Sequence, residues 1–135
     1  MEHRKISLIV SGAREEAKIN YDSIKGTIKF SMKNGFTKTY ESTDLYLCLA
    51  KIRHDNPEVI FMCKGAKLNV TPSRMCSQMS GGVIAYELKD GKSATFEDIV
   101  QIFDYEENNL AKSLKEQREY YYTWLNSLLI ALTYK

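Results

Sequence analysis

Histidine and cysteine, which often serve as catalytic bases, nucleophiles and zinc ligands, are scarce in this chain. It contains two histidines, His3 and His54, and three cysteines, Cys48, Cys63 and Cys76. No Cys-x-x-Cys pair occurs, and neither histidine stands near a cysteine or near the other histidine, so the usual spacing of zinc ligands is missing. An odd number of cysteines does not suggest a disulfide framework. We expect three unreactive, partly buried thiols, no metal site and no cofactor.

Long hydrophobic runs are also missing. The apolar run Ile6–Val10 is shorter than the roughly 7–15 residues of a signal-peptide core. The apolar end, Trp124–Leu132, is far short of the about 20 residues that span a bilayer. We therefore expect a cytoplasmic protein that does not contact a membrane.

Neither sign of charge dominates the chain. Nineteen basic and seventeen acidic side chains give a net charge of +2, which is too balanced for the broad basic surface of a nucleic-acid-binding protein. Direct binding of nucleic acid is not expected, and any charged interaction must be local. At 135 residues and 44% hydrophobic content, the chain fits one domain, residues 1–135, with a core of its own.

The first part of the chain shows strand patterns. Ile6–Ser11 is apolar on both faces, as in an interior strand. Thr27–Lys33 alternates strictly, and Asn34-Gly35 after it predicts a type I′ hairpin turn into a second strand, Phe36–Glu41. Residues Ala13–Ser23 are polar and weakly periodic, and they fit either a short helix or a loop.

Helix signals follow. A single apolar stripe predicts a helix from about Thr43 to Arg53, which ends before Asn56-Pro57. Val59–Cys63 fits a buried strand. Thr71-Pro72 resembles an N-cap and first helical residue, so Ser73–Ser80 is expected to be a short helix that Gly81-Gly82 ends.

The C-terminal half alternates between the two kinds of element. Val83–Leu88 is a predicted strand, and Asp90-Gly91 turns the chain back. Thr95–Asp98 matches a capping box, and we favour a short turn followed by a strand, Ile99–Tyr105, over a helix. Asn108–Leu132 has the spacing of a long amphipathic helix. Together these elements predict an α+β fold: an antiparallel-dominated sheet of five or six strands, two shorter helices, and a long C-terminal helix packed on one face.

Five acidic residues stand close together with no basic residue among them: Glu97, Asp98, Asp104, Glu106 and Glu107. They could bind a metal or act as general acid and base, form a solvated edge, or dock a basic partner. Large apolar residues alternate with these acids, unlike the polar surroundings expected of a two-carboxylate active site. A solvated edge or a docking surface for a cationic partner therefore fits better.

Aromatic residues gather near the C-terminus. Tyr120, Tyr121, Tyr122 and Trp124 point around most of the circumference of a helix, so they cannot all enter one core. At least Tyr120 or Tyr122 is expected to remain partly exposed. Exposed tyrosines are favoured anchors at protein interfaces. Alternatively, the tyrosine rings lie along the sheet and their hydroxyl groups reach the solvent.

The segment from Val59 to Asp104 resembles small bacterial immunity proteins, in particular those of contact-dependent growth inhibition systems. The resemblance covers about one-third of the chain and is structural in kind. It is carried by Cys63-Lys64-Gly65, Val70–Met75, Gln78-Met79, Ala85–Leu88, Gly91-Lys92 and Asp98–Asp104.

This resemblance implies a non-enzymatic inhibitor that binds the C-terminal domain of a cognate toxin, in many such systems a nuclease, for example a tRNase. Immunity proteins against nucleases are often strongly acidic, and the net charge of +2 departs from that pattern. The sequence therefore predicts partner binding through Glu97, Asp98, Asp104, Glu106, Glu107, Tyr120 and Tyr122. The competing hypotheses are a small metal-dependent hydrolase or nuclease that uses the acidic run, and a non-catalytic adaptor or transcription-associated module.

Overall fold

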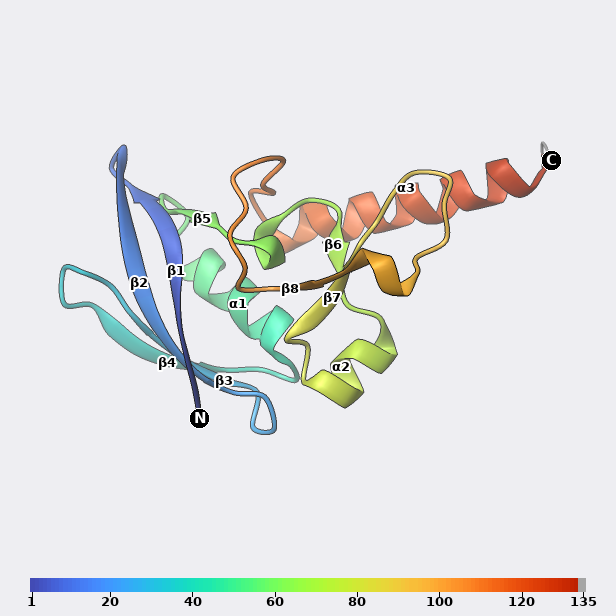
Figure 1. The fold of residues 1–135 in the computed structure, drawn as a ribbon. Coiled ribbons are helices and arrows are strands. Elements are labelled where there is room, and N and C mark those ends of the chain that lie inside the picture. Colours follow the sequence, from blue (N-terminus) through green and yellow to red (C-terminus); the bar gives the residue numbers. More distant parts are fainter. Residues whose placement is uncertain (134–135) are drawn as a thin grey trace.

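The computed structural model describes residues 1–133 of the chain. It has an α+β fold with two antiparallel sheets and three α-helices (Figure 1). The first sheet has five strands in the order β4-β3-β2-β1-β5. Their bounds are β1 Glu2–Val10, β2 Ala13–Asp22, β3 Thr27–Ser31, β4 Thr37–Glu41 and β5 Ile60–Met62. The second sheet has the order β6-β7-β8, with bounds Val70–Thr71, Ile84–Glu87 and Ile99–Gln101.

The expected α+β fold is confirmed, but its strands are divided differently. A single sheet of five or six strands was predicted, whereas the strands from residue 70 onward form a separate small sheet. Strand β1 pairs with β2 on one side and β5 on the other, which confirms its interior position. One hydrophobic core joins both sheets, because Val70, Ala85 and Ile102 belong to the same buried cluster as Leu8 and Phe30.

Strand β2 corrects the prediction of a helix or loop for Ala13–Ser23. Ala17, Ile19 and Tyr21 are buried on one face of this strand. Its register is set by the turn before it, where Ser11 and Gly12 have φ values of 50° and 82° and lead directly into the pairing of Val10 with Ala13. The alternation of buried and exposed residues along β2 is hard to recognise in the sequence, because Ala17 is small and the residues before it are mostly polar.

The β3–β4 hairpin is confirmed, but its turn type is not. Only Gly35 of the predicted pair has positive φ, at 95°. The Gly35 N–H donates to the carbonyl of Met32 at 3.1 Å, and the Met32 N–H donates to the carbonyl of Phe36 at 2.8 Å. This pattern is a three-residue loop that ends in a glycine bulge instead of a two-residue type I′ turn. The side chain of Asn34 accepts from the Phe36 N–H at 2.9 Å and stabilises the loop.

Helix α1, Leu45–Asp55, packs on the five-stranded sheet, and its predicted stripe Leu45, Cys48, Leu49 and Ile52 is buried. Helix α2, Arg74–Ser80, is capped by Ser73, two residues after the predicted cap at Thr71, because the Ser73 hydroxyl accepts from the Cys76 N–H at 3.0 Å. Gly81 ends α2 with φ 65°, as expected. A capping box at Thr95 and Asp98 opens a short 3-10 turn, η2 Phe96–Asp98, and β8 follows as predicted, although it ends at Gln101 instead of Tyr105.

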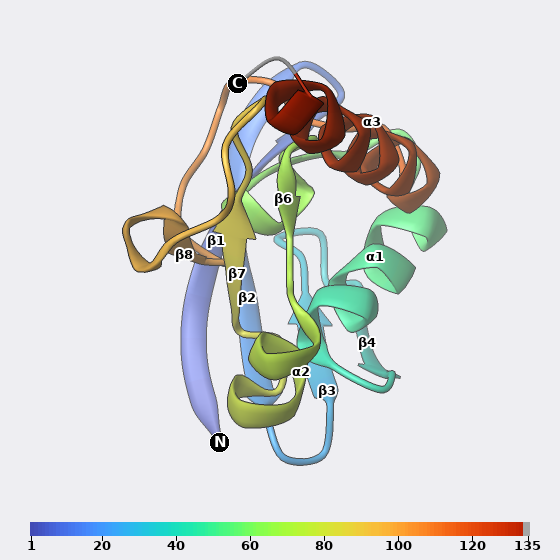
Figure 2. The same cartoon turned by 90° about the vertical axis from the view of Figure 1, so that its right-hand side faces the viewer.

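Helix α3, Leu114–Thr133, begins six residues later than predicted, because residues 108–113 form bends that pair with the core of the molecule. The Ala111 N–H donates to the carbonyl of Ala66 at 2.8 Å, and Leu110 bridges to Lys67. The first turns of α3 lie against β6, while its C-terminal end extends beyond the rest of the molecule (Figure 1 and Figure 2). No helix within residues 1–133 has the length and apolar character required to cross a membrane.

Candidate partner-binding surface

Two of the five predicted acidic residues are buried and bound to groups of this chain. The first is Asp98, which is 9% exposed; one carboxylate oxygen lies 3.0 Å from Nζ of Lys89, and the other accepts from the Thr95 N–H at 2.9 Å. The Thr95 N–H and Lys89 hold the pKa of Asp98 below its usual value. Asp98 therefore joins the turn before β8 to the turn that follows β7.

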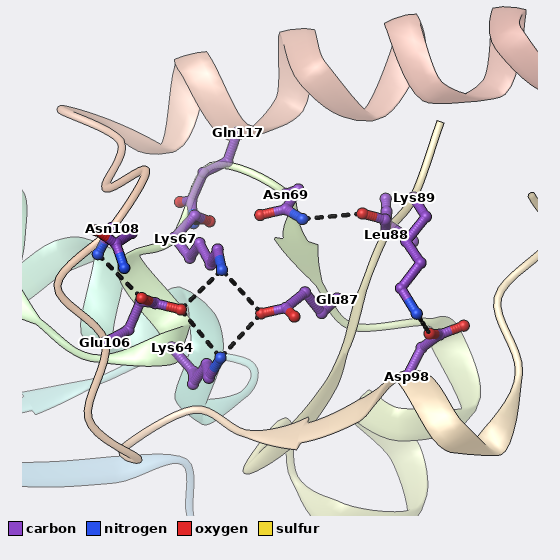
Figure 3. Close-up of polar contacts among 10 residues, drawn as sticks. All are labelled: Lys64, Lys67, Asn69, Glu87, Leu88, Lys89, Asp98, Glu106, Asn108 and Gln117. Atoms are coloured by element: carbon purple, nitrogen blue, oxygen red, sulfur yellow. Dashed lines mark hydrogen bonds and ion pairs between the residues drawn. The ribbon is translucent and has the colours of Figure 1, made fainter. Parts of the chain in front are cut away.

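The second, Glu106, lies at the centre of a four-charge cluster formed by Lys64, Lys67, Glu87 and Glu106 (Figure 3). Its Oε1 is 2.7 Å from Nζ of Lys67 and 3.0 Å from Nζ of Lys64, and its Oε2 accepts from the Asn108 N–H at 2.9 Å. Desolvation favours the neutral acid, but these hydrogen bonds outweigh it and lower the pKa of Glu106 to about 2. The cluster connects the segment after β5, strand β7 and the chain that leads to α3.

The remaining three acids are exposed. Asp104 lies 2.8 Å from the guanidinium of Arg4, and Glu107 lies 3.3 Å from that of Arg14. Glu97, on η2, forms no ion pair with another residue of the described chain. Exposed ion pairs of this kind contribute little to stability, and a partner can replace them.

The acidic run therefore does not fold into one unneutralised surface. Lysine and arginine side chains from β1, β2 and the region between residues 64 and 89 pair with four of its members. Asp98 and Glu106 have structural contacts, whereas partner binding by Glu97, Asp104 and Glu107 stays a prediction. Within residues 1–133, no three His, Cys, Asp or Glu side chains are grouped as metal ligands would be.

The aromatic segment has two distinct parts, of which the first fixes α3 to the turn after β7. The Tyr120 hydroxyl donates to Oδ1 of Asp90 at 2.7 Å. The indole Nε1 of Trp124 lies 3.0 Å from the carbonyl oxygens of both Lys89 and Lys92. The Ser127 hydroxyl oxygen accepts from the Gly91 N–H at 2.8 Å. Tyr120 is therefore half-buried and bonded within the chain.

The second part is an exposed stripe on α3, formed by Tyr122, Leu125, Leu129 and Leu132, which we call the α3 stripe. These residues follow one another at spacings of three and four, so they lie on the same side of the helix. Tyr122, Leu129 and Leu132 are 69%, 63% and 66% exposed, while Leu125 is half-buried. The expectation that Tyr120 or Tyr122 remains partly exposed is confirmed.

The α3 stripe continues past the point at which the helix is held. Ser127 is the last α3 side chain that bonds to the body of the molecule within the described residues. Beyond it the helix projects, as Figure 1 shows, so Leu129 and Leu132 have no large apolar surface of the described chain to cover them. The sequence pattern predicted an amphipathic helix here, but it did not indicate which leucines the body would leave uncovered.

All three cysteines are free and buried. Burial raises the pKa of the Cys48 and Cys63 thiols to about 11. Because the thiolate is the reactive form, these side chains behave as small hydrophobic residues of the core. The predicted unreactive character of the cysteines agrees with this environment.

No protein-family model matches this chain, and a search of curated proteins finds no significant relative.

Proposed function

We propose that this protein is a non-enzymatic immunity protein that binds and neutralises the toxin domain of a contact-dependent growth inhibition system. The sequence resemblance between Val59 and Asp104 suggests the class of partner. The observation that carries the proposal is the α3 stripe, an exposed aromatic and aliphatic surface on a projecting helix. Exposed apolar surfaces of this kind mark sites of protein association, and tyrosine is enriched among the residues that contribute most to binding.

The proposed mode of action is stoichiometric occlusion. Hydrogen bonds of Tyr120 and Trp124 fix the N-terminal part of α3 to the turn after β7. The free C-terminal end offers about 9 Å of helix beyond Ser127, since six described residues at about 1.5 Å each follow it. This end would lie in an apolar groove of the toxin, and the exposed acids Asp104 and Glu107 would not be required for that contact.

The competing hypothesis of a metal-dependent hydrolase has less support, because four of the five acidic residues that it would use form ion pairs with lysine or arginine side chains. The proposal predicts that a neighbouring gene encodes a toxin domain, and it is tested by titrating that domain with the purified protein while following toxin activity. We expect activity to fall in proportion to the added protein and to vanish near a molar ratio of one. Toxin activity that is unchanged in excess protein would contradict the proposal.

A further inference from the structure

A groove of about 850 Å³ runs along the outer side of α1. Leu47, Ala50, Lys51 and His54 line it from the helix, at spacings that place them on one side. Strand β4 borders the groove through Lys38 and Tyr40, and residues 112–115 close it beside the first turn of α3. Figure 2 shows α1 and the start of α3 on the same side of the molecule.

The charge of this groove is one-sided. Its basic lining residues are Lys38, Lys51, Arg53, His54, Lys112 and Lys115, and its acidic lining residue is Asp55. That acid is already satisfied, because Asp55 accepts from the Tyr40 hydroxyl at 2.7 Å and from Nζ of Lys38 at 3.0 Å. These two hydrogen bonds lower the pKa of Asp55, so it stays charged and is matched by Lys38. Lys115 lies 3.9 Å from Glu119, whereas Lys51, Arg53 and Lys112 form no ion pair within the described chain and leave the groove net positive.

Arg53 adds a buried positive charge at the base of the groove. The residue is 7% exposed, and its guanidinium donates to Oε1 of Gln117 at 2.9 Å and to the carbonyl of Ala111 at 3.2 Å. Both partners are neutral, and no carboxylate of the described chain lies within ion-pair distance of it. Buried charges are normally paired, so this position favours an anionic group nearby.

We propose that the groove binds an acidic segment of a partner polypeptide, with carboxylates beside the lysines and an apolar side chain over Leu47, Ala50 and Leu114. From Leu47 to His54 the helix rises about 10 Å, which an extended peptide covers with about three residues. A compact anion such as phosphate fits less well, because the basic residues come from three separate segments and line an apolar floor instead of converging on one point.

The proposal goes beyond toxin binding through α3, and its test needs no toxin. A fluorescein-labelled peptide of about eight residues, composed of Asp, Glu and two Leu, is titrated with the protein and followed by fluorescence anisotropy. We expect saturable binding that weakens as salt rises. Lys51→Glu and Lys112→Glu should each weaken binding at least about fivefold. Lys112 makes no ion pair within the described chain, so we expect its replacement to leave the fold intact even if Lys51→Glu perturbs α1.

The matched control is Lys29→Glu, which makes the same charge change on the opposite face of the sheet, where Lys29 pairs with Thr39. It should bind the peptide as the wild type does. A peptide in which Lys replaces the acids should not bind. The proposal is overturned if the acidic peptide does not bind, if Lys112→Glu and Lys29→Glu have equal effects, or if a single-stranded oligonucleotide of similar length binds more tightly at the same residues.

Discussion

The Oε1 atom of Glu106 lies 2.7 Å from Nζ of Lys67, and the glutamate is 8% exposed. This contact places a member of the predicted acidic run inside the molecule, where it joins the chain before α3 to the segment after β5. We expect Glu106→Gln to lower the free energy of unfolding by about 2 kcal/mol, because it leaves Lys64 and Lys67 with one carboxylate between them. Glu107→Gln, at an exposed neighbour, should cost less than about 0.5 kcal/mol. Urea unfolding at neutral pH measures both.

The same contact makes stability depend on pH. The pKa of Glu106 is about 2 in the folded protein and about 4.3 in an unfolded chain. A lowered folded-state pKa adds stability that is complete above the unfolded value and is lost as pH falls toward the folded value. The stability difference between wild type and Glu106→Gln should therefore be full at about pH 6 and shrink between about pH 5 and pH 2. An equal difference at about pH 6 and about pH 3 would contradict this assignment.

Gly81 is held in a conformation that other residues rarely adopt. Its φ is 65°, and an added Cβ would overlap the carbonyl oxygen of Ser23. Its own carbonyl accepts from the Leu45 N–H at 2.7 Å, so a shift here also disturbs the start of α1. We expect Gly81→Ala to cost about 3 kcal/mol, whereas Gly91→Ala, with φ 72° and open space around it, should cost about 1 kcal/mol. Equal melting temperatures for the two variants would show that the contact with Ser23 is not tight.

The buried thiols allow a test of the core. Because burial raises the pKa of Cys48 and Cys63 to about 11, almost no thiolate is present at neutral pH. We expect a thiol-reactive dye to modify these two cysteines at least about 100-fold more slowly in the folded protein than in urea. Mass spectrometry of peptides after partial labelling identifies the sites. Fast labelling of Cys63 without denaturant would mean that the core opens locally.

Local patterns in the sequence were sufficient for most elements. The β3–β4 hairpin, α1 and the capping box at Thr95 are each set by residues close together in the chain, and all three are confirmed. Strand β2 was missed because its pairing with β1, and not its own weak periodicity, determines its conformation.

The site was less predictable, because its properties depend on residues far apart in the sequence. Arg4 neutralises Asp104 across 100 positions, and Lys64 reaches Glu106 across 42. No local pattern relates these residues. The groove beside α1 likewise combines β4, α1 and residues 112–115. No local sequence pattern indicates that these three segments lie side by side.

The α3 stripe carries the proposed function, and a pair of matched variants tests it. Leu129→Ser removes an apolar side chain from the stripe, and Ile130→Ser removes one that is 52% exposed on another side of the same helix. We expect Leu129→Ser to weaken toxin binding at least tenfold, about 1.4 kcal/mol, and Ile130→Ser to leave it within about twofold. Circular dichroism shows whether both variants are folded, and sedimentation shows whether the stripe instead pairs two copies of this chain.

The central proposal is tested by isothermal titration calorimetry of the purified protein against the toxin domain that a neighbouring gene is proposed to encode. We expect a one-to-one complex whose affinity falls with Leu129→Ser and not with Ile130→Ser. Absence of binding by the wild-type protein, or equal affinities for the two variants, would contradict it.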